Sequence, residues 1–389
     1  MNKETERKFA EVRSRFPHTR EVVFLNSAAY GPFSDEVKQA IDDNVNLRVK
    51  AEFDDTHYAF STAEELRNDY AGLVGADKED IGLGLNTSFG LNVAAFGLPY
   101  PEGSEVLVSD IEFPAVVYAW RAAAERFGYK LTFVKSKDKC FDIDELKKAV
   151  TPKSKVLSLS FVQFFNGFKN DLAALSKFCK EHDLLFVVDG IQGAGTEPVK
   201  VKELGIDVFT SGCQKWLLAP QGCSFFYVSS KVRDKITPPF MSWLGVDWHM
   251  NFSSLFDYER PYFDSARRLE FGYYVVLNIA GMKAAIRYFQ ELGVENIQTH
   301  NYRLIDRLAA FIESDPYYKI TSTMEPRHRS SIFTFTCDNL LELHQELLKK
   351  KIIVARREGS IRVSVHLFNN EADIDKLIAM LEDFSTKNS

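Results

Sequence analysis

Short apolar runs alternate with helical patterns along the first 230 residues of the chain. The runs are rich in β-branched and aromatic residues and predict strands, and stretches with helical periodicity follow most of them. The predicted strands cover residues 81–86, 104–110, 130–136, 154–162, 184–190, 207–211 and 223–230. Such alternation favours a mostly parallel sheet with helices on both faces. Ligands of these sheets bind beyond the carboxyl ends of the strands, which is where we expect the site.

The pattern changes after about residue 265. Helical patterns run from Glu270 to Leu292 and over residues 294–314, and then strands and helices mix up to the C-terminus. This mixture predicts a smaller α+β domain. Because 389 residues exceed what one compact core usually holds, we expect several units. They are an N-terminal helical segment over 1–20, a large domain over 21–265 and a small domain over 266–389.

A lysine stands directly after a predicted strand, in SGCQKWLLAP. Lys215 lies between that strand and a tryptophan, where an ammonium group loses solvation. A partly apolar pocket favours the neutral amine, the form that makes a Schiff base with a carbonyl cofactor. A lysine that reaches solvent from the strand end is the competing interpretation.

A carboxylate ends another predicted strand, in VVDGIQGAG. An unpaired Asp189 at the end of an apolar strand would be costly. A pyridinium nitrogen is a suitable partner, because the carboxylate keeps it protonated and the ring then acts as an electron sink. Gln192 follows three residues later and is a candidate to bond the ring hydroxyl or the Schiff base. A helix-capping Asp is the competing interpretation.

Two other strand ends carry candidate cofactor contacts. In LNTSFGLN a strand turns into a helix, and Thr87, Ser88 and free amides there form a phosphate cradle or an ordinary helix cap. In DIEFPAV, Phe113 is placed to stack on a planar ring or to fill the core.

The order and type of these elements resemble the class V aminotransferases. These are the fold-type-I pyridoxal-phosphate enzymes that include cysteine desulfurases, kynureninase and isopenicillin-N-epimerase-like proteins. The resemblance runs from FLNSAAYGP, at Phe24, to VSVHLFNNEADID near the C-terminus. It implies an α/β fold whose large domain has a mostly parallel seven-stranded sheet, with a smaller C-terminal α+β domain. It also implies pyridoxal 5′-phosphate on Lys215, its ring nitrogen paired with Asp189, its phosphate near Ser88 and its ring stacked on Phe113.

The resemblance also covers the substrate side of the site. SIRVSVHLFNN resembles the family's C-terminal Arg-x-Ser motif, so Arg362 is expected to bind the substrate α-carboxylate bidentately. VQFFNGFKND resembles the loop beside the cofactor's 3′-oxygen and leaves Gln163 or Asn166 as its partner. NSAAYGP resembles the loop that lines the substrate pocket. The weaker candidates for that pocket are Asn26, Tyr30 and Trp243.

Two positions depart from the family pattern. Desulfurases usually show Ser-x-His-Lys where this chain reads Gly-Cys-Gln-Lys, ending at Lys215. The phosphate contacts are therefore expected to pass to Ser211 and Gln214. In EFGYYV, Tyr273 stands where the family often offers a Thr to the partner subunit's phosphate. The resemblance implies a homodimer, in which Tyr273 would reach the neighbouring phosphate.

The lack of a cysteine in one segment limits the reactions that the protein can catalyse. Lys215 as a base suits transamination, epimerisation, β-elimination and desulfuration alike. A desulfurase needs a nucleophilic cysteine shortly before the carboxylate-binding Arg, but IIVARREGSIRVSV has none, and Cys337 is expected in the core. We therefore expect an aminotransferase acting at Cα of a small amino acid. A C–S lyase or an epimerase without a catalytic cysteine stays open, and a desulfurase or a non-catalytic binding protein of the same fold is less favoured.

The composition of the chain limits the kinds of binding partner and the location that we expect. The formal net charge of −6 argues against nucleic acid, and no apolar run reaches the roughly 18 residues of a membrane span. The five cysteines form no CxxC pair and no zinc spacing, so we expect no metal, reduced thiols and a cytoplasmic location. A dinucleotide-binding dehydrogenase is the alternative from another class, but IGLGLN lacks the GxGxxG spacing.

Overall fold

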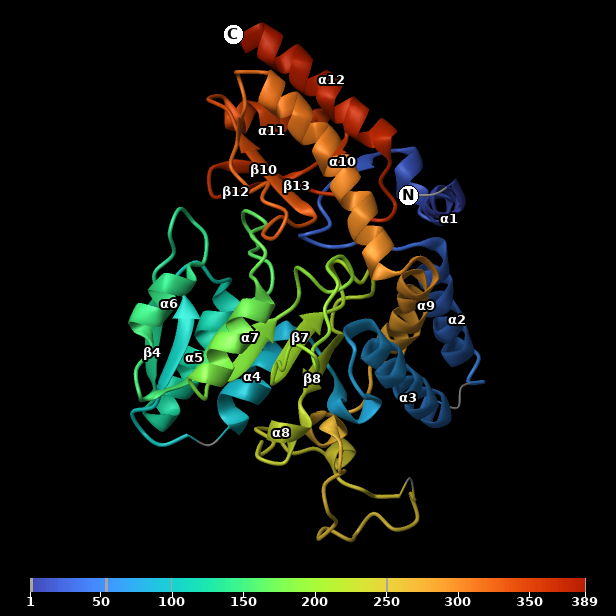
Figure 1. The fold of residues 1–389 in the computed structure, drawn as a ribbon. Coiled ribbons are helices and arrows are strands. Elements are labelled where there is room, and N and C mark those ends of the chain that lie inside the picture. Colours follow the sequence, from blue (N-terminus) through green and yellow to red (C-terminus); the bar gives the residue numbers. More distant parts are fainter. Residues whose placement is uncertain (1–2, 53–54, 99, 250, 389) are drawn as a thin grey trace.

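A seven-stranded sheet forms the centre of the large domain (Figure 1). The computed structural model describes residues 3–52, 55–98, 100–249 and 251–388. The strand order is β2-β8-β7-β6-β5-β3-β4, and all neighbours pair in parallel except β8, which is antiparallel to both β7 and β2. The strands are β2 (Ile81–Gly84), β3 (Glu105–Ser109), β4 (Lys130–Val134), β5 (Ser154–Ser160), β6 (Leu185–Asp189), β7 (Val208–Gly212) and β8 (Ser224–Val228). The predicted strands and the mostly parallel sheet are confirmed.

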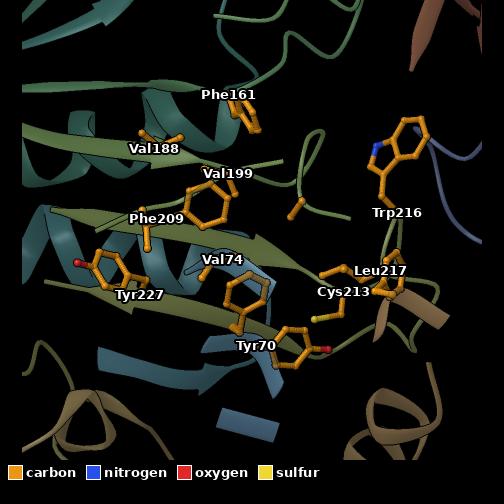
Figure 2. Close-up of a cluster of buried hydrophobic side chains, with 14 of the residues drawn as sticks. Tyr70, Val74, Phe161, Val188, Val199, Phe209, Cys213, Trp216, Leu217 and Tyr227 are labelled. Atoms are coloured by element: carbon orange, nitrogen blue, oxygen red, sulfur yellow. The ribbon is translucent and has the colours of Figure 1, made fainter. Parts of the chain in front are cut away.

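Helices cover both faces of this sheet. Along β6, Val187 packs toward one face and Val188 toward the other, as strand alternation requires. Figure 2 shows side chains of the second face, among them Tyr70 and Val188. Tyr70 stacks there on Phe225, with ring centroids 4.5 Å apart. The helices of the first face are α4 (Thr87–Gly97) and α5 (Pro114–Phe127), and those of the second include α3 (Asp55–Val74) and α7 (Leu172–Glu181). Among the described residues, no helix is long and apolar enough to span a membrane.

One glycine brings helix α4 close to the sheet. A Cβ atom at Gly90 would lie 2.2 Å from Oγ1 of Thr210 in β7, a distance that no side chain tolerates. The close approach places the first turn of α4 beside the carboxyl end of β7. The turn that resembles a phosphate loop and the strand that precedes Lys215 therefore meet at one sheet edge.

The small domain has a four-stranded antiparallel sheet ordered β12-β13-β10-β9, which lies between its helices and the large domain (Figure 1). Its strands are β9 (Lys319–Ile320), β10 (Ile332–Thr336), β12 (Ala355–Arg357) and β13 (Ser360–Ser364), and its helices are α10 (Val294–Ser314), α11 (Leu340–Lys349) and α12 (Glu371–Asn388). Val23 and Leu25 from the start of the chain belong to its core. Strand β1 (Val23–Phe24) also pairs with β11 (Ile352–Ile353).

The helices before this domain pack with the large core. Helix α9 (Val276–Leu292) lies against α2 (Asp35–Val49) and α3, and its buried residues belong to the larger hydrophobic cluster. Helix α1 (Lys3–Ser14) is joined to α12 by an ion pair between Arg13 and Asp373 of 2.7 Å. The domain boundaries at residues 20 and 265 stay predictions. Helix α9 packs in the core of the large domain, although it follows residue 265 in the chain.

The helix predicted from Glu270 begins later, at Val276. Glu270 is buried, and its carboxylate accepts hydrogen bonds from Arg67 Nε and from the backbone N–H of Leu83, both 2.9 Å. Gly272 has a φ of 80°, which is outside the helical region. The fixed carboxylate and this glycine keep residues 270–275 out of the helix, so this expected start was wrong.

Candidate active site

Lys215 lies just beyond the carboxyl end of β7, and its Nζ atom is 5.6 Å from the centre of the Phe113 ring. Phe113 is the residue before α5 and is 41% exposed. The ring of Phe164 meets it nearly edge-on, at 5.2 Å and 76°. One face of Phe113 is thus supported by the protein while the residue keeps exposed surface beside the lysine.

The amine of Lys215 loses its proton more readily than that of an ordinary lysine. Burial lowers its pKa to about 8. The negative charge of Asp189 opposes this shift, and the positive charges of Arg362 and Arg357 add to it. About half of the amines are then unprotonated at pH 8, compared with about 0.3% for a lysine of ordinary pKa. A nucleophilic amine is therefore available at this strand end.

Asp189 is the last residue of β6 and is buried. Burial raises the pKa of Asp189 to about 6, although the backbone N–H of Ile191 donates to Oδ1 at 2.9 Å and Lys215 also favours the charged form. Within the described part of the chain, no cationic side chain lies within ion-pair distance of this carboxylate. A buried acid without a paired cation suits a cationic ring nitrogen.

Glu112 is a second buried acid beside Asp189, and sequence reasoning missed it. Its Oε1 accepts a hydrogen bond of 2.9 Å from Gln163 Nε2, and its Oε2 accepts one of 3.0 Å from the backbone N–H of Ser160. Burial raises the pKa of Glu112 to about 7 against these hydrogen bonds, and the charge of Asp189 raises it further. Only its position next to Phe113 in IEFP hinted at a role, and that position is equally typical of a surface acid.

The two amides in the loop after β5 have different surroundings. Gln163 is fully buried, and its Oε1 atom has no hydrogen-bond partner in the structure. Asn166 is held within the loop, because its Nδ2 donates to Lys139 O at 2.8 Å and its Oδ1 accepts from Phe168 N at 3.1 Å. Gln163 therefore has unused bonding capacity at the site, whereas Asn166 holds the loop in shape.

Gln192 ties the N-terminal loop to the lysine segment. Its Nε2 donates to Ala28 O at 3.1 Å, and its Oε1 accepts from Trp216 Nε1 at 2.8 Å. The loop also packs closely on the lysine, since a Cβ atom at Gly31 would lie 2.4 Å from Lys215 O. The side chain of Gln192 thus already has two protein partners.

The turn into α4 forms a compact polar cradle. Thr87 Oγ1 accepts a hydrogen bond of 2.8 Å from Gly212 N, and a Cβ atom at Gly212 would lie 2.5 Å from Gln214 Oε1. Gln214 Oε1 is buried without a partner. Ser88 is the exposed second residue of α4, and Ser211 is buried with its hydroxyl directed at Gly212 O, 3.2 Å away. Hydroxyls and the free amides of a helix start suit a phosphate group.

Arg362 lies in β13 and is 2% exposed. Its Nη1 donates to Phe164 O at 2.5 Å and its Nη2 to Asn26 Oδ1 at 3.5 Å, while its Nε is buried without a partner. Burial and the neighbouring Arg357 lower its pKa to about 9. Because no acid among the described side chains pairs with it, this arginine is prepared for an anionic ligand.

The remaining aromatic candidates lie in two places. Tyr30 is 47% exposed and meets Phe24 edge-on at 5.4 Å. Trp243 and Tyr273 stack on each other at 6.1 Å and form an aromatic cluster with Phe60. Both remain more than a third exposed. Trp243 and Tyr273 therefore make ring contacts with this cluster. Asn26, in contrast, accepts a hydrogen bond from Arg362.

Curated proteins of similar sequence include some named as aminotransferases and some named as cysteine desulfurases. An uncharacterized aminotransferase, YcbU, of Bacillus subtilis (strain 168) is 25% identical over 366 residues, which cover 94% of this chain and 95% of that protein. A probable cysteine desulfurase of Pyrococcus abyssi (strain GE5 / Orsay) is 23% identical over 400 residues, covering 96% of each.

Solved structures share the whole fold. The apo cysteine desulfurase of Thermococcus onnurineus NA1 matches with a TM-score of 0.86 at 21% identity, covering 97% of this chain and 98% of that one. The cystine C–S lyase C-DES, in complex with its product cysteine persulfide, matches with a TM-score of 0.86 at 23% identity, covering 95% and 99%. A mutant of C-DES with glycine covalently linked to its PLP cofactor matches with a TM-score of 0.87.

A family model described as aminotransferase class-V matches residues 23–377. The match spans both domains and includes every strand of the large sheet. The predicted fold class, the enzymatic character and the pyridoxal-phosphate cofactor are thereby confirmed. This chain belongs to the class-V aminotransferase family.

Proposed function

We propose that this protein acts at the Cα atom of a small amino acid through pyridoxal phosphate held on Lys215, and that transamination is its reaction. One observation carries the proposal: Lys215, a partly buried lysine of lowered pKa, has its Nζ atom 5.6 Å from the centre of the Phe113 ring. It lies near the buried Asp189, which has no ion-pair partner among the described residues. Neutral nucleophile, stacking surface and acid for a ring nitrogen are the three groups that hold a pyridoxal ring.

The side chains at this sheet edge fit the cofactor. Among the described residues, the buried polar atoms without a partner include Oε1 of Gln163, Oε1 of Gln214 and Nε of Arg362. Such atoms are costly unless a ligand satisfies them. We expect Gln163 beside the 3′-oxygen and Gln214 beside the phosphate, where an amide group can serve as a hydrogen-bond partner.

Each residue has a definite part in holding the cofactor. Thr87, Ser88 and the amides of the first turn of α4 bind the phosphate, with Ser211 and Gln214 beside them. Phe113 supports the ring, and Gln163 is preferred over Asn166 as partner of the 3′-oxygen. Gln192 would help by keeping the N-terminal loop in place against the lysine segment. When bound, the cofactor supplies an electron sink that makes the Cα–H bond of an attached amino acid acidic.

The substrate side is formed by the small domain. Arg362 binds the α-carboxylate with two N–H groups and exchanges its weak contact with Asn26 for a charge-assisted pair. Lys215 then moves the proton at Cα, for which an amine of pKa near the working pH is well suited. Asp189 holds the proton on the ring nitrogen. Asn26 and Tyr30 line the entrance.

A C–S lyase reaction is the second candidate, favoured by the lack of a nucleophilic thiol near the site. Three cysteines are buried in the larger core, namely Cys179, Cys213 and Cys223. Cys337 is half-buried against the small-domain core. Burial raises the pKa of Cys337 to about 11, so its thiol is a poor nucleophile. The same facts speak against a persulfide-relaying desulfurase.

The assembly that fits this function is a homodimer. Exposed aromatic side chains gather in the described residues between 240 and 275, part of which extend as a loop below the large sheet (Figure 1). Clusters of this kind are typical of interfaces. A partner copy on this face would cover Trp243 and Tyr273. The free cysteines also agree with a cytoplasmic location.

The test is an absorbance spectrum of the purified protein, recorded with and without amino acids. We expect a near-visible band from the bound cofactor that changes when a substrate is added, with keto acid released. Transamination should release the keto acid without ammonia, because the amino group stays on the cofactor. Keto acid released together with sulfide and ammonia would favour the C–S lyase. A band that no amino acid changes would contradict both reactions, and Lys215→Ala serves as the control that binds cofactor without turnover.

A further inference from the structure

The β12–β13 hairpin places a second arginine on the same face as Arg362. Its register pairs Ala355 with Arg362 and Arg357 with Ser360. Directly opposite residues project to one face and alternate residues share it, so Arg357 lies diagonally next to Arg362. Arg356, which pairs with Ile361, lies on the opposite face.

The turn of the hairpin fixes this arrangement. Glu358 and Gly359 have φ values of 45° and 80°, and two consecutive residues of positive φ form the tight turn that matches the twist of a hairpin. This short, rigid turn fixes the register of β12 on β13. A shift of that register by one residue would exchange the faces of Arg356 and Arg357, and the turn disfavours it.

The two faces of the small sheet differ in character. Ile361 and Val363 are fully buried in the core formed with helices α10–α12. The other face carries Arg362, which reaches Phe164 O of the large domain, and Ser360, whose Oγ lies 2.8 Å from Thr321 Oγ1. Arg357 therefore belongs to the polar face, the one that is turned toward the lysine.

Arg357 has no acidic partner of its own. Its recorded hydrogen bond runs from Nη1 to Arg356 O at 2.8 Å, and in the described ranges no carboxylate lies within ion-pair distance. Its charge acts on the site, because it contributes to the lowered pKa of both Lys215 and Arg362. The side chain is exposed, so a ligand can reach it.

We propose that Arg357 binds an anionic group on the substrate's side chain, so that the preferred substrates are amino acids with a second carboxylate or an equivalent anion. Arg362 takes the α-carboxylate, and the guanidinium of Arg357 takes the second group by the same bidentate geometry. This inference rests on the proposed function and names the class of its substrate.

The test compares acids with uncharged analogues of the same shape on the cofactor-loaded enzyme. The pairs are aspartate with asparagine, glutamate with glutamine, and 2-aminoadipate with norleucine. We expect at least one acid to have a kcat/KM about 10- to 100-fold above its analogue, as a charge-assisted contact provides. Arg357→Gln should abolish this preference mainly through KM, and Arg357→Glu should reverse it.

Arg356→Gln is the matched control, since it removes one arginine from the same strand but from the other face. It should keep the preference. Uncharged amino acids that react equally well with wild type and Arg357→Gln, with no preference for acids in either, would overturn the inference and leave the proposed function standing. If no amino acid changes the cofactor band in any variant, both are overturned.

Discussion

Gln163 donates a hydrogen bond of 2.9 Å to Glu112, and both side chains are buried within reach of the charge of Asp189. The bond fixes the amide of Gln163 and leaves its Oε1 without a partner. Glu112 thus positions the residue expected at the cofactor's 3′-oxygen, while its own pKa is raised to about 7.

The raised pKa of Glu112 predicts a pH-dependent stability. A carboxyl whose folded pKa lies above its unfolded value stabilises the fold at low pH, and this contribution is lost as pH rises from about 4.5 through 7. In the cofactor-free wild-type protein, Glu112 should lower the free energy of unfolding by on the order of 3 kcal/mol between pH 5 and pH 8. Glu112→Gln should lack this decrease. Urea unfolding measures the free energy of unfolding at each pH.

Asp189 also titrates in this pH range and is present in both proteins. The difference between the two proteins therefore reports Glu112 together with its coupling to Asp189. The exposed Glu203, changed to Gln, is the control and should leave the pH dependence as in wild type. Equal pH slopes for Glu112→Gln and wild type would show that Glu112 is ionised throughout and would contradict the raised pKa.

Asp189→Asn should keep part of the cofactor binding but slow turnover by at least about 10²-fold. The amide has the shape of the acid but cannot stabilise a proton on the ring nitrogen. Steady-state kcat and the cofactor absorbance, measured on the same sample, separate loss of chemistry from loss of cofactor. Turnover near the wild-type rate would remove Asp189 from its assigned role.

Arg362→Ala should weaken substrate capture and leave the cofactor spectrum intact. Removing one partner of a desolvated charge pair costs roughly 2–5 kcal/mol, which corresponds to a loss of tens to thousands of fold. Amino-acid titrations of the cofactor band measure the affinity, with Arg356→Ala as the control on the other face of the hairpin. An affinity equal to that of wild type would show that the carboxylate binds elsewhere.

Replacing Cys140 and Cys337 together by Ala should leave turnover within about twofold. They are the two cysteines that are not fully buried, and burial raises the pKa of each thiol. If the folded double variant lost its activity, a thiol would take part in the chemistry, and the argument against a persulfide relay would fail.

The order of the large-domain strands along the chain was predictable because most of them are apolar runs buried on both faces. The edge strand β4 is the exception, since its burial is only partial. The start of α9 was not predictable, because it depends on the buried contacts of Glu270 with Arg67 and Leu83, which come from distant segments. Periodicity alone cannot register such contacts.

The candidate site could be selected from the sequence where a residue type is unusual for its position, as for Lys215 and Asp189 at strand ends. Glu112 escaped notice because its burial is created by the loop after β5, and an acid beside a helix start is ordinary in sequence. Arg357 differs from Arg356 only in the face it occupies, and the register of the hairpin decides that face.

The central claim is that Lys215 carries the cofactor. Reduction of the cofactor-loaded protein with borohydride, followed by peptide mapping, tests it most directly, because reduction makes the bond to the lysine permanent. We predict the pyridoxyl group on the peptide that contains SGCQKW, at Lys215, with no label there in Lys215→Ala. A pyridoxyl group on a different lysine of the wild-type protein would contradict the assignment.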